Sequence, residues 1–282
     1  ITAAPSLAAL PGVPYLYAAN LNHLLRIPLQ GNEHTPQPVL LDNNGLGGVA
    51  IAADLVRNKL LVSNNLNGQI ATVNPNGTGY TVIADASADD LIHDYRLAMA
   101  VDEAAARLYW TQIDSFYLSS IKSARLDGSD VRTIVPQILN QRGLTLDPVR
   151  KKLLWVATDR SERENIIFSS NLDGSDVQAI YAAPVGQQIR YLAIDPYSQK
   201  FYWIDPTYNG GALFWADSDG GRVAVLHESL GKDARGIVVS PQQNALYFTQ
   251  ETSVVRTDLD GGNLQLLTDL NGARYTGVSN LD

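Results

Sequence analysis

The sequence contains no cysteine, only four histidines and no long apolar run. The absence of cysteine excludes disulfides, thiol catalysis, iron–sulfur clusters and cysteine-ligated zinc. The four histidines are scattered, with no His-x-x-x-His pair and no Gly-x-Ser-x-Gly motif, which argues against zinc sites and hydrolase triads. No apolar stretch approaches the roughly 20 residues that span a bilayer, so we expect no membrane partner.

Positive charge is also scarce. The formal net charge is −8, because 29 acidic residues outnumber 21 basic ones. Nucleic acids and anionic membranes are bound chiefly through clustered Lys and Arg, so neither is an expected partner. There is no glycine-rich phosphate loop with a following Lys-Ser or Lys-Thr, and we expect no cofactor and no metal. Hydrophobic residues at 45 % and charged residues at 18 % are ordinary for a folded chain.

What the chain does contain is a repeat. Residues 107–111, Arg-Leu-Tyr-Trp-Thr, have close copies ending near Trp155, Trp203 and Phe248, and weaker copies ending near Ala18 and Val62. Successive copies are 44 to 48 residues apart. A period of this length, built from short β-branched and aromatic runs, predicts a radial array of four-stranded blades, since a helical repeat would show apolar residues at i, i+3 and i+4. The array is expected to be a β-propeller, with Trp110, Trp155 and Trp203 in its core.

Each copy carries the same parts in the same order. An apolar run that ends in an acidic or small residue precedes the Tyr-Trp segment, and a third strand that ends in an Asp-Gly or Asn-Gly turn follows it. The apolar runs are at 97–102, 144–148, 192–196 and 237–241. A strand without alternation is buried on both faces, so these runs are predicted to be inner strands packed between neighbouring blades. Glycine suits the turns because it accepts a positive φ without a steric cost.

We therefore predict an all-β chain, in which residues 1–282 form a single six-bladed β-propeller domain of four-stranded antiparallel blades, with residues 1–12 as an N-terminal arm. Five blades are expected at 46–85, 97–135, 143–181, 191–227 and 236–269. The first blade, with strands at 15–19, 23–28 and 38–41, lacks an inner strand. Residues 275–279 match that pattern at the other end of the chain. One C-terminal strand should thus complete the N-terminal blade and remove the open sheet edges.

The repeats resemble the YWTD repeats of the low-density lipoprotein receptor type, or class B repeats, which form six-bladed propellers. The resemblance covers nearly the whole chain and is strongest around the three tryptophans. The fourth motif position is Gln112, Ala157, Asp205 and Gln250 in the clearer copies, so the aspartate of the family is kept once. The resemblance implies a protein- or peptide-binding module. Against this, the disulfide-rich modules that usually accompany such receptor propellers are absent, and most motif aspartates are lost.

Arginines recur just before the predicted inner strands. Arg142, Arg190, Arg235 and Arg274 each lie five residues before the closing residue of the strand, and Arg96 is displaced by one. In a propeller these links surround the mouth of the central channel. One interpretation is a ring of guanidiniums that binds a carboxylate, phenolate or enolate. The other is that each arginine pairs with a carboxylate of a neighbouring blade.

The candidate catalytic residues are Arg142, Arg190 and Arg274. The candidate substrate-binding residues are Arg96, Arg235, His93, Tyr95, Tyr117, Tyr191, Tyr208 and Tyr275. Gln141 and Gln188 are also expected at the mouth. Aromatic walls with a few polar groups suit a small-molecule pocket, although the same side chains serve equally well in a protein interface.

Three functions follow from these residues. The first is a cofactor-independent enzyme or binder for a small aromatic or anionic organic molecule. In size and architecture the chain is similar to stand-alone fungal hetero-Diels–Alderase propellers, which implies a cycloaddition in natural-product biosynthesis, helped by positioning and by Arg donors that stabilise developing oxyanion charge. The second is a protein- or peptide-binding YWTD module without catalysis. The third is a purely structural role, as in a surface or spore-coat protein.

Secretion is a further expectation. The numbering opens at Ile1 rather than at Met, which fits a mature chain after signal removal or a trimmed chain. Asn76-Gly77-Thr78 is an acceptor sequence for N-glycosylation, but it is equally an ordinary turn sequence.

Overall fold

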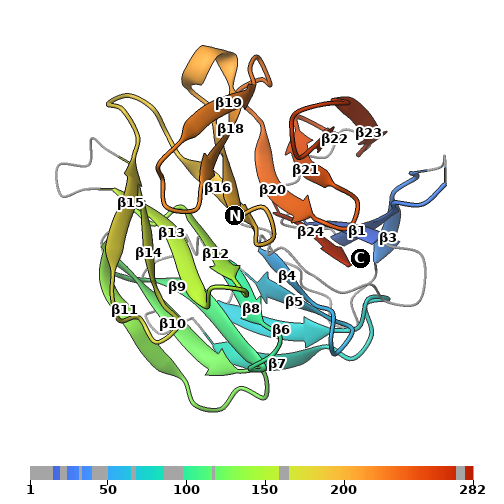
Figure 1. Ribbon diagram of the computed structural model, residues 1–282. Helices are drawn as coiled ribbons and strands as arrows, with labels where there is room; N and C mark the ends of the chain where they lie inside the picture. The colour runs from blue at the N-terminus through green and yellow to red at the C-terminus, as the bar shows by residue number, and fades with distance from the viewer. Residues whose placement is uncertain are drawn as a thin grey trace.

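The computed structural model describes residues 15–19, 24–31, 34–39, 50–64, 68–85, 98–115, 118–158, 165–270 and 277–281. Six four-stranded antiparallel sheets are arranged around a common centre as the blades of a propeller (Figure 1). The prediction of an all-β, six-bladed propeller is confirmed. Within the ranges just given, helix is limited to one 3₁₀ turn, Tyr208–Gly210, and no helix could cross a bilayer. The predicted arm at 1–12 lies outside the described residues.

Blades 1 to 3 take their strands from the first half of the chain and from its C-terminal end. Blade 1 consists of β24 (Gly277–Leu281), β1 (Tyr15–Ala19), β2 (Leu24–Pro28) and β3 (Gln37–Val39). Blade 2 consists of β4 (Ile51–Asp54), β5 (Lys59–Asn64), β6 (Gln69–Val73) and β7 (Thr81–Asp85). Blade 3 consists of β8 (Met99–Asp102), β9 (Arg107–Ser115), β10 (Leu118–Arg125) and β11 (Arg132–Leu139).

Blades 4 to 6 follow in sequence order. Blade 4 consists of β12 (Gly143–Asp147), β13 (Lys152–Thr158), β14 (Asn165–Asn171) and β15 (Gln178–Ala182). Blade 5 consists of β16 (Arg190–Asp195), β17 (Lys200–Asp205), β18 (Ala212–Asp217) and β19 (Val223–His227). Blade 6 consists of β20 (Arg235–Ser240), β21 (Ala245–Gln250), β22 (Ser253–Asp258) and β23 (Gln265–Asp269).

The inner strands are buried on both faces, as their unalternated apolar sequences predicted. Every residue of β4, β8 and β12 is buried. Each hydrophobic cluster joins two adjacent blades; for example, Trp155 shares one with Tyr109 of blade 3, and Trp203 shares another with Val156 of blade 4. The side chains of Trp110, Trp155 and Trp203 are at most 2 % exposed, which confirms their place in the core.

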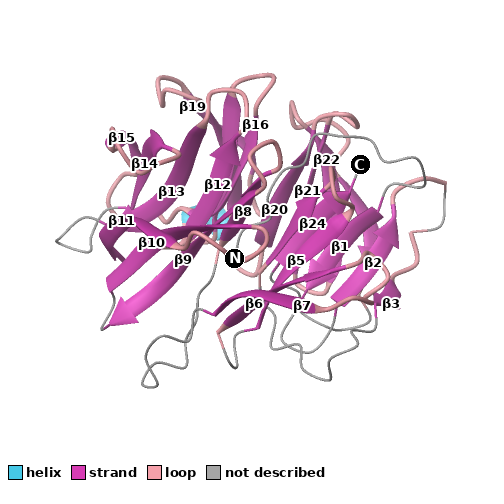
Figure 2. Cartoon of the chain, turned by 90° about the horizontal axis from the view of Figure 1, so that it is seen from below, coloured by secondary structure: helices cyan, strands magenta, loops and turns pink. Residues whose placement is uncertain are grey.

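The ring closes through the two ends of the chain. β24 pairs antiparallel with β1, from Tyr15 opposite Leu281 to Ala19 opposite Gly277, and the two strands lie side by side in Figure 2. The inner strands contact one another in the order β24, β4, β8, β12, β16, β20 and back to β24. The predicted closure is confirmed, although the closing strand begins two residues later than expected.

Aspartates at the ends of the inner strands have a structural role. Asp147 Oδ1 accepts hydrogen bonds from the backbone N–H groups of Val149 and Arg150, and the carboxylate of Asp195 caps the turn after β16 in the same way. These carboxylates shape the turn into the second strand. Across the described ranges, no group of three or more His, Asp or Glu side chains is placed to hold a metal ion.

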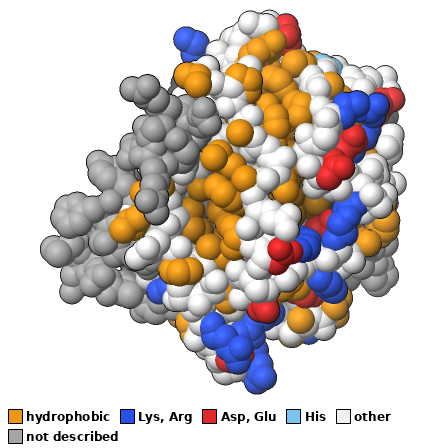
Figure 3. All heavy atoms as spheres, turned by 60° about the vertical axis from the view of Figure 1, so that its left-hand side comes forward, with side chains coloured by type: hydrophobic (Ala, Val, Ile, Leu, Met, Phe, Trp, Pro, Cys, Tyr) orange, Lys and Arg blue, Asp and Glu red, His pale blue; other side chains and the backbone are white. Residues whose placement is uncertain are grey.

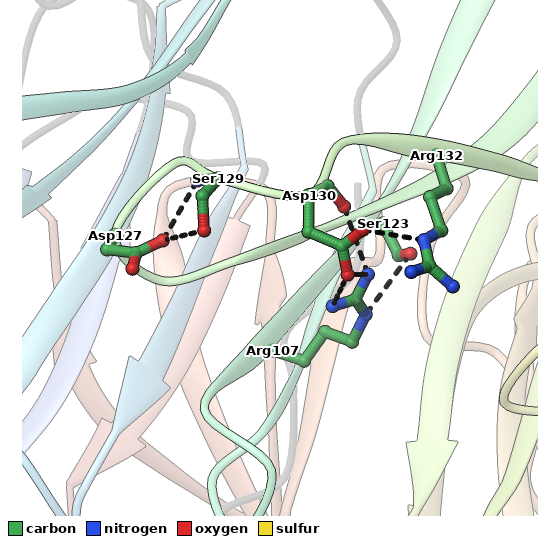
Figure 4. A network of polar contacts seen from close by, with 6 residues as sticks. All are labelled: Arg107, Ser123, Asp127, Ser129, Asp130 and Arg132. Carbon is green, nitrogen blue, oxygen red and sulfur yellow. Dashed lines mark hydrogen bonds and ion pairs between the residues drawn. The ribbon is translucent and has the colours of Figure 1, made fainter.

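The basic residue that opens the second strand ties that strand to the turn between the third and outer strands. In blade 3, Nη1 and Nη2 of Arg107 both donate to Asp130 Oδ2, at 3.0 and 2.9 Å, and Arg132 reaches the other carboxylate oxygen (Figure 4). In blade 4, Lys152 donates to Asp176 at 3.1 Å. In these two blades the basic residue of the motif thus links two parts of its own blade.

The Asp-Gly turns also join neighbouring blades, which their sequence did not reveal. A Cβ built on Gly128, in the turn of blade 3, would lie 2.6 Å from the carbonyl oxygen of Ile83 on β7 of blade 2. Gly174 and Gly220 approach the carbonyl oxygens of Ile134 and Ile180 in the same way. Glycine is therefore required for the close approach of two backbones as well as for its positive φ. In the related turn of blade 2, Asn76 is exposed and accepts hydrogen bonds from Thr78. The glycosylation of Asn76 remains a prediction.

This packing predicts unequal effects of two glycine substitutions. Gly128→Ala and Gly186→Ala both place an alanine at positive φ, but a Cβ on Gly186 meets no atom within 4 Å. Both variants carry the strain of the left-handed conformation, about 1–2 kcal/mol. Gly128→Ala should lower the free energy of unfolding by about a further 1–3 kcal/mol through overpacking. Equal losses in chemical denaturation would show that the turns do not hold neighbouring blades together.

Candidate functional site

The entrances to the inner strands meet at one end of the central channel. In blades 2 to 6 the inner strand is the first strand of its blade, and in blade 1 the same position is taken by β24. Adjacent inner strands contact one another around the ring. Their first residues therefore lie at the same end, together with the links between the second and third strands. We call this end of blades 4 to 6 the channel-mouth face. It includes the segment 183–190, the Asp205–Tyr208 link and the segment 230–235.

Three of the five predicted arginines lie in the described residues, each at the entrance to an inner strand. Arg142 precedes β12, and its backbone N–H donates to Val156 O at 3.0 Å. Arg235 opens β20 and forms an ion pair at 3.4 Å with Asp233, which belongs to the same link rather than to a neighbouring blade. Arg190 opens β16, and its buried Nε has no hydrogen-bond partner in the described structure. The three arginines therefore occupy equivalent positions with different surroundings.

The two described tyrosine candidates pack against the core. Tyr191 has a positive φ of 55°, lies at a β-bulge, is 8 % exposed and belongs to the hydrophobic cluster between blades 5 and 6. Tyr208 lies in the 3₁₀ turn with its ring edge-on to Phe214, at a centroid distance of 5.2 Å. The other candidates lie outside the described residues: Arg96, Arg274, His93, Tyr95, Tyr117 and Tyr275. A complete ring of arginines and tyrosines therefore remains a prediction.

The one motif aspartate that the chain keeps organises the channel-mouth face. Asp205 is 1 % exposed. Its Oδ1 accepts hydrogen bonds from Thr207 N, Thr207 Oγ1 and Tyr208 N at 2.5–3.2 Å, and its Oδ2 accepts one from Gln188 N at 3.1 Å. Burial raises the pKa of the Tyr181 phenol above its usual value, and the negative charge of Asp205 raises it further. Asp205 thus holds the link after β17 to the segment that enters β16.

Several buried side-chain atoms in and next to blades 4 and 5 have no hydrogen-bond partner in the described structure. We call these residues the polar boundary. Its unpaired atoms are Gln141 Nε2, Thr145 Oγ1, Thr158 Oγ1, Asn165 Oδ1, Gln188 Oε1 and Arg190 Nε. Within the described part of the chain, none of these atoms has a hydrogen-bond partner. An unpaired buried polar group costs about 1–3 kcal/mol, so water or a ligand is expected to satisfy these atoms.

Strand register brings two of these side chains together. Thr158 is directly opposite Asn165, and they lie on the same strand faces as Val156 and Ile167 of the hydrophobic cluster shared by blades 4 and 5. The Asn165 Nδ2 donates to Gln187 O at 3.3 Å, which places Gln188 next to this pair. Sequence reasoning had placed Gln141 and Gln188 at the mouth but missed Thr145, Thr158 and Asn165. No repeat marks these three residues, so only the fold shows that their polar atoms are buried without a partner.

A second surface lies on the rim of blades 3 and 4. Val131 and Val177 are 56 % and 47 % exposed. Figure 3 brings forward the side on which β11, β14 and β15 lie in Figure 1, and hydrophobic side chains form a strip on it. A partner that approaches from the side would meet this strip rather than the channel mouth.

Comparisons with known proteins support a YWTD-type propeller. No protein-family model matches the chain. A Pyricularia oryzae protein named low-density lipoprotein receptor-related protein 1 is 32 % identical over 148 residues, or 46 % of this chain and 47 % of that protein. The Drosophila grimshawi protein cueball is 31 % identical over 111 residues, 38 % of this chain and 17 % of that protein. The chain thus spans about half, or less, of the curated relatives it matches.

Solved structures share the fold. A chain in the crystal structure of a nidogen/laminin complex matches with a TM-score of 0.78 and 21 % identity, over 95 % of this chain and 98 % of that one. TolB from Acinetobacter baumannii matches with a TM-score of 0.74 and 12 % identity, over 95 % of this chain and 66 % of that one. At these identities the similarity shows the propeller fold alone. None of these proteins is named as a hetero-Diels–Alderase, so the expected resemblance to that group stays a prediction.

The hydrogen bonds of Asp205 predict a local loss of order when its carboxylate is removed. Asp205→Ala should lower the free energy of unfolding by about 3 kcal/mol, the upper end for lost hydrogen bonds to a charged group. It should also speed amide hydrogen exchange at Gln188, Thr207 and Tyr208. The control is Asp219→Ala, because Asp219 accepts a bond from Gly221 N in an exposed turn. Unchanged exchange in the Asp205 variant would contradict this role.

Proposed function

We propose that this chain is a protein- or peptide-binding propeller module whose channel-mouth face receives the partner. The observation that carries the proposal is the match in fold to a chain of a nidogen/laminin complex, in which a propeller of this kind occurs in an assembly of proteins. The similarity to a fungal protein named low-density lipoprotein receptor-related protein 1 supports the same class of function. Catalysis has no support of this kind.

The channel-mouth face suits such a role physically. Its links are held by buried hydrogen bonds, as at Asp205, so a partner would lose little free energy in ordering them. Arg190, at the start of β16, is partly buried on this face, and its buried Nε has no hydrogen-bond partner in the described structure. Arginine is enriched among the residues that dominate the binding energy of interfaces. The face thus offers a rigid surface with an arginine among its links.

A matched pair of arginine variants tests the proposal. Peptides selected from a displayed library on the immobilised full chain should bind the parent, and Arg190→Ala should weaken the best peptide at least tenfold, about 1.4 kcal/mol. Arg132→Ala is the control, because Arg132 is 66 % exposed on the rim and pairs with Asp130. Fluorescence polarisation gives both affinities.

Two results would contradict the proposal. A library that yields no peptide for the folded parent would argue against a peptide-binding module. A loss of affinity in Arg132→Ala with none in Arg190→Ala would move the contact to the apolar rim.

A small-molecule binder or enzyme is the second candidate, and the unpaired Nε of Arg190 is the observation that favours it. The cofactor-free cycloaddition belongs to this candidate, with Arg142, Arg190 and Arg274 polarising an oxygen of the substrate. The same arginine variants distinguish it. A tropolone or phenolate that raises the melting temperature of the parent but not of Arg190→Ala, in a chain that selects no peptide, would favour this second candidate.

A further inference from the structure

We propose that the end of the propeller opposite the channel mouth docks a second partner, a protein segment that carries carboxylates beside apolar side chains. The inner strands of blades 2 to 5 start at the channel mouth, so the turns that follow them lie at the other end. We call these turns, at 54–59, 102–107, 147–152 and 195–200, the opposite face. This surface is separate from the channel-mouth face, and the proposal does not depend on that face.

One position of these turns carries an exposed apolar side chain in four successive blades. It is the second residue after the aspartate that ends the inner strand, and its residues are Val56, Ala104, Val149 and Tyr197. Val56, Val149 and Tyr197 are 64 %, 58 % and 64 % exposed. The turn itself does not require an apolar residue there, because blade 6 has Gln242 at the same position between equivalent paired residues. Exposed apolar groups gathered on one face mark interaction sites.

Contacts between blades hold three of these turns together. The side chain of Glu103, in the turn of blade 3, accepts a hydrogen bond from Leu55 N of blade 2 at 2.7 Å, and Arg57 Nη1 of blade 2 donates to Glu103 O at 3.2 Å. Lys151 of blade 4 pairs with Asp102 of blade 3 at 3.6 Å. Because β12 and β16 contact each other, the turn of blade 5 lies next to that of blade 4. The four turns thus form a continuous arc around the end of the channel.

The charge that this arc exposes is positive, although the chain as a whole is acidic. Three ion pairs join a cation of the arc to an aspartate at the end of an inner strand: Arg57 with Asp54, Arg150 with Asp147, and Lys151 with Asp102. Each aspartate side chain is at most 3 % exposed, whereas the cations are 39 %, 28 % and 51 % exposed in that order.

Two of these cations keep donors for a further carboxylate. Within the described residues, the hydrogen bonds of Arg57 come from Nη1 alone, although a guanidinium has five N–H groups. The 3.6 Å between Lys151 and Asp102 is longer than an ordinary hydrogen bond, so the ammonium group of Lys151 can donate to another acceptor. Carboxylates of a partner are therefore the complementary charges for this arc.

The outer turns of the same end carry exposed negative charge, which disfavours an anionic membrane as the occupant. The turns between the third and outer strands place exposed aspartates farther from the channel: Asp127, Asp173, Asp219 and Asp260. Hydrogen bonds from Ser129 and Ser175 hold the pKa of Asp127 and of Asp173 below its usual value, so both stay ionised. A flat anionic surface would meet these carboxylates, whereas a narrow chain segment can lie along the arc inside them.

Selection with depletion tests the proposal. Peptides from a displayed library are bound to the immobilised full chain, and those that also bind the double variant Val149→Ser/Tyr197→Ser are removed, which discards peptides of the channel mouth. The remaining peptides should be rich in Asp and Glu next to apolar residues. In fluorescence polarisation, the double variant should bind the best peptide at least tenfold more weakly than the parent does, and added salt should weaken binding to the parent.

Three single variants separate this surface from the others. Lys151→Gln should weaken the peptide at least threefold and reduce the effect of salt, because it removes one exposed cation. Gln242→Ala, at the same turn position in blade 6, and Arg190→Ala, at the channel mouth, should bind the peptide as the parent does. The side chains of Val149 and Tyr197 are exposed, so the melting temperature of the double variant should match that of the parent.

The proposal is overturned if no peptide survives the depletion, or if the surviving peptides carry no excess of Asp and Glu. It is also overturned if Arg190→Ala loses the peptide as the double variant does. Sedimentation with vesicles of phosphatidylcholine and phosphatidylserine is a further check, because binding to them by the parent but not by the double variant would make a membrane the occupant. The channel-mouth peptide has its own selection and its own variant, so either proposal can fail without the other.

Discussion

The structure depends on one constraint: each inner strand is apolar on both faces and needs a blade on either side. A row of blades would leave two such strands exposed at its ends. The pairing of β24 with β1 removes that problem, because it supplies blade 1 with an inner strand that contacts both β20 and β4. The tryptophans fill the spaces between blades, and the Asp-Gly turns of blades 3, 4 and 5 lie against the backbone of the preceding blade.

This closed ring fixes the channel-mouth face. The motif aspartate that remains, Asp205, is bonded to its own link and to the entrance of its own blade, so its role is structural. In blade 5 the motif aspartate therefore supports the links of its own blade. Between blades 4 and 5 the apolar packing gives way to side chains with unpaired polar atoms.

Much of the fold could be predicted from the sequence, because each blade repeats a local pattern. The burial of Trp155 and the closing strand both followed from that pattern. The contact of Gly128 with the carbonyl of Ile83 did not, because it joins two repeats through backbone atoms that carry no sequence signal. Thr158 and Asn165 escaped notice for a similar reason: an ordinary threonine or asparagine becomes informative only when its neighbours leave it unpaired. Arg190 was predicted at the mouth and lies there, but its companion Arg274 is not among the described residues.

The central claim is that the channel-mouth face of blades 4 to 6 receives a peptide partner. The most direct test is a crystal structure of the full chain with a peptide selected on it. The account predicts that the peptide contacts the links around Arg190 on this face. The contrary result is a peptide that contacts the rim of blades 3 and 4 instead.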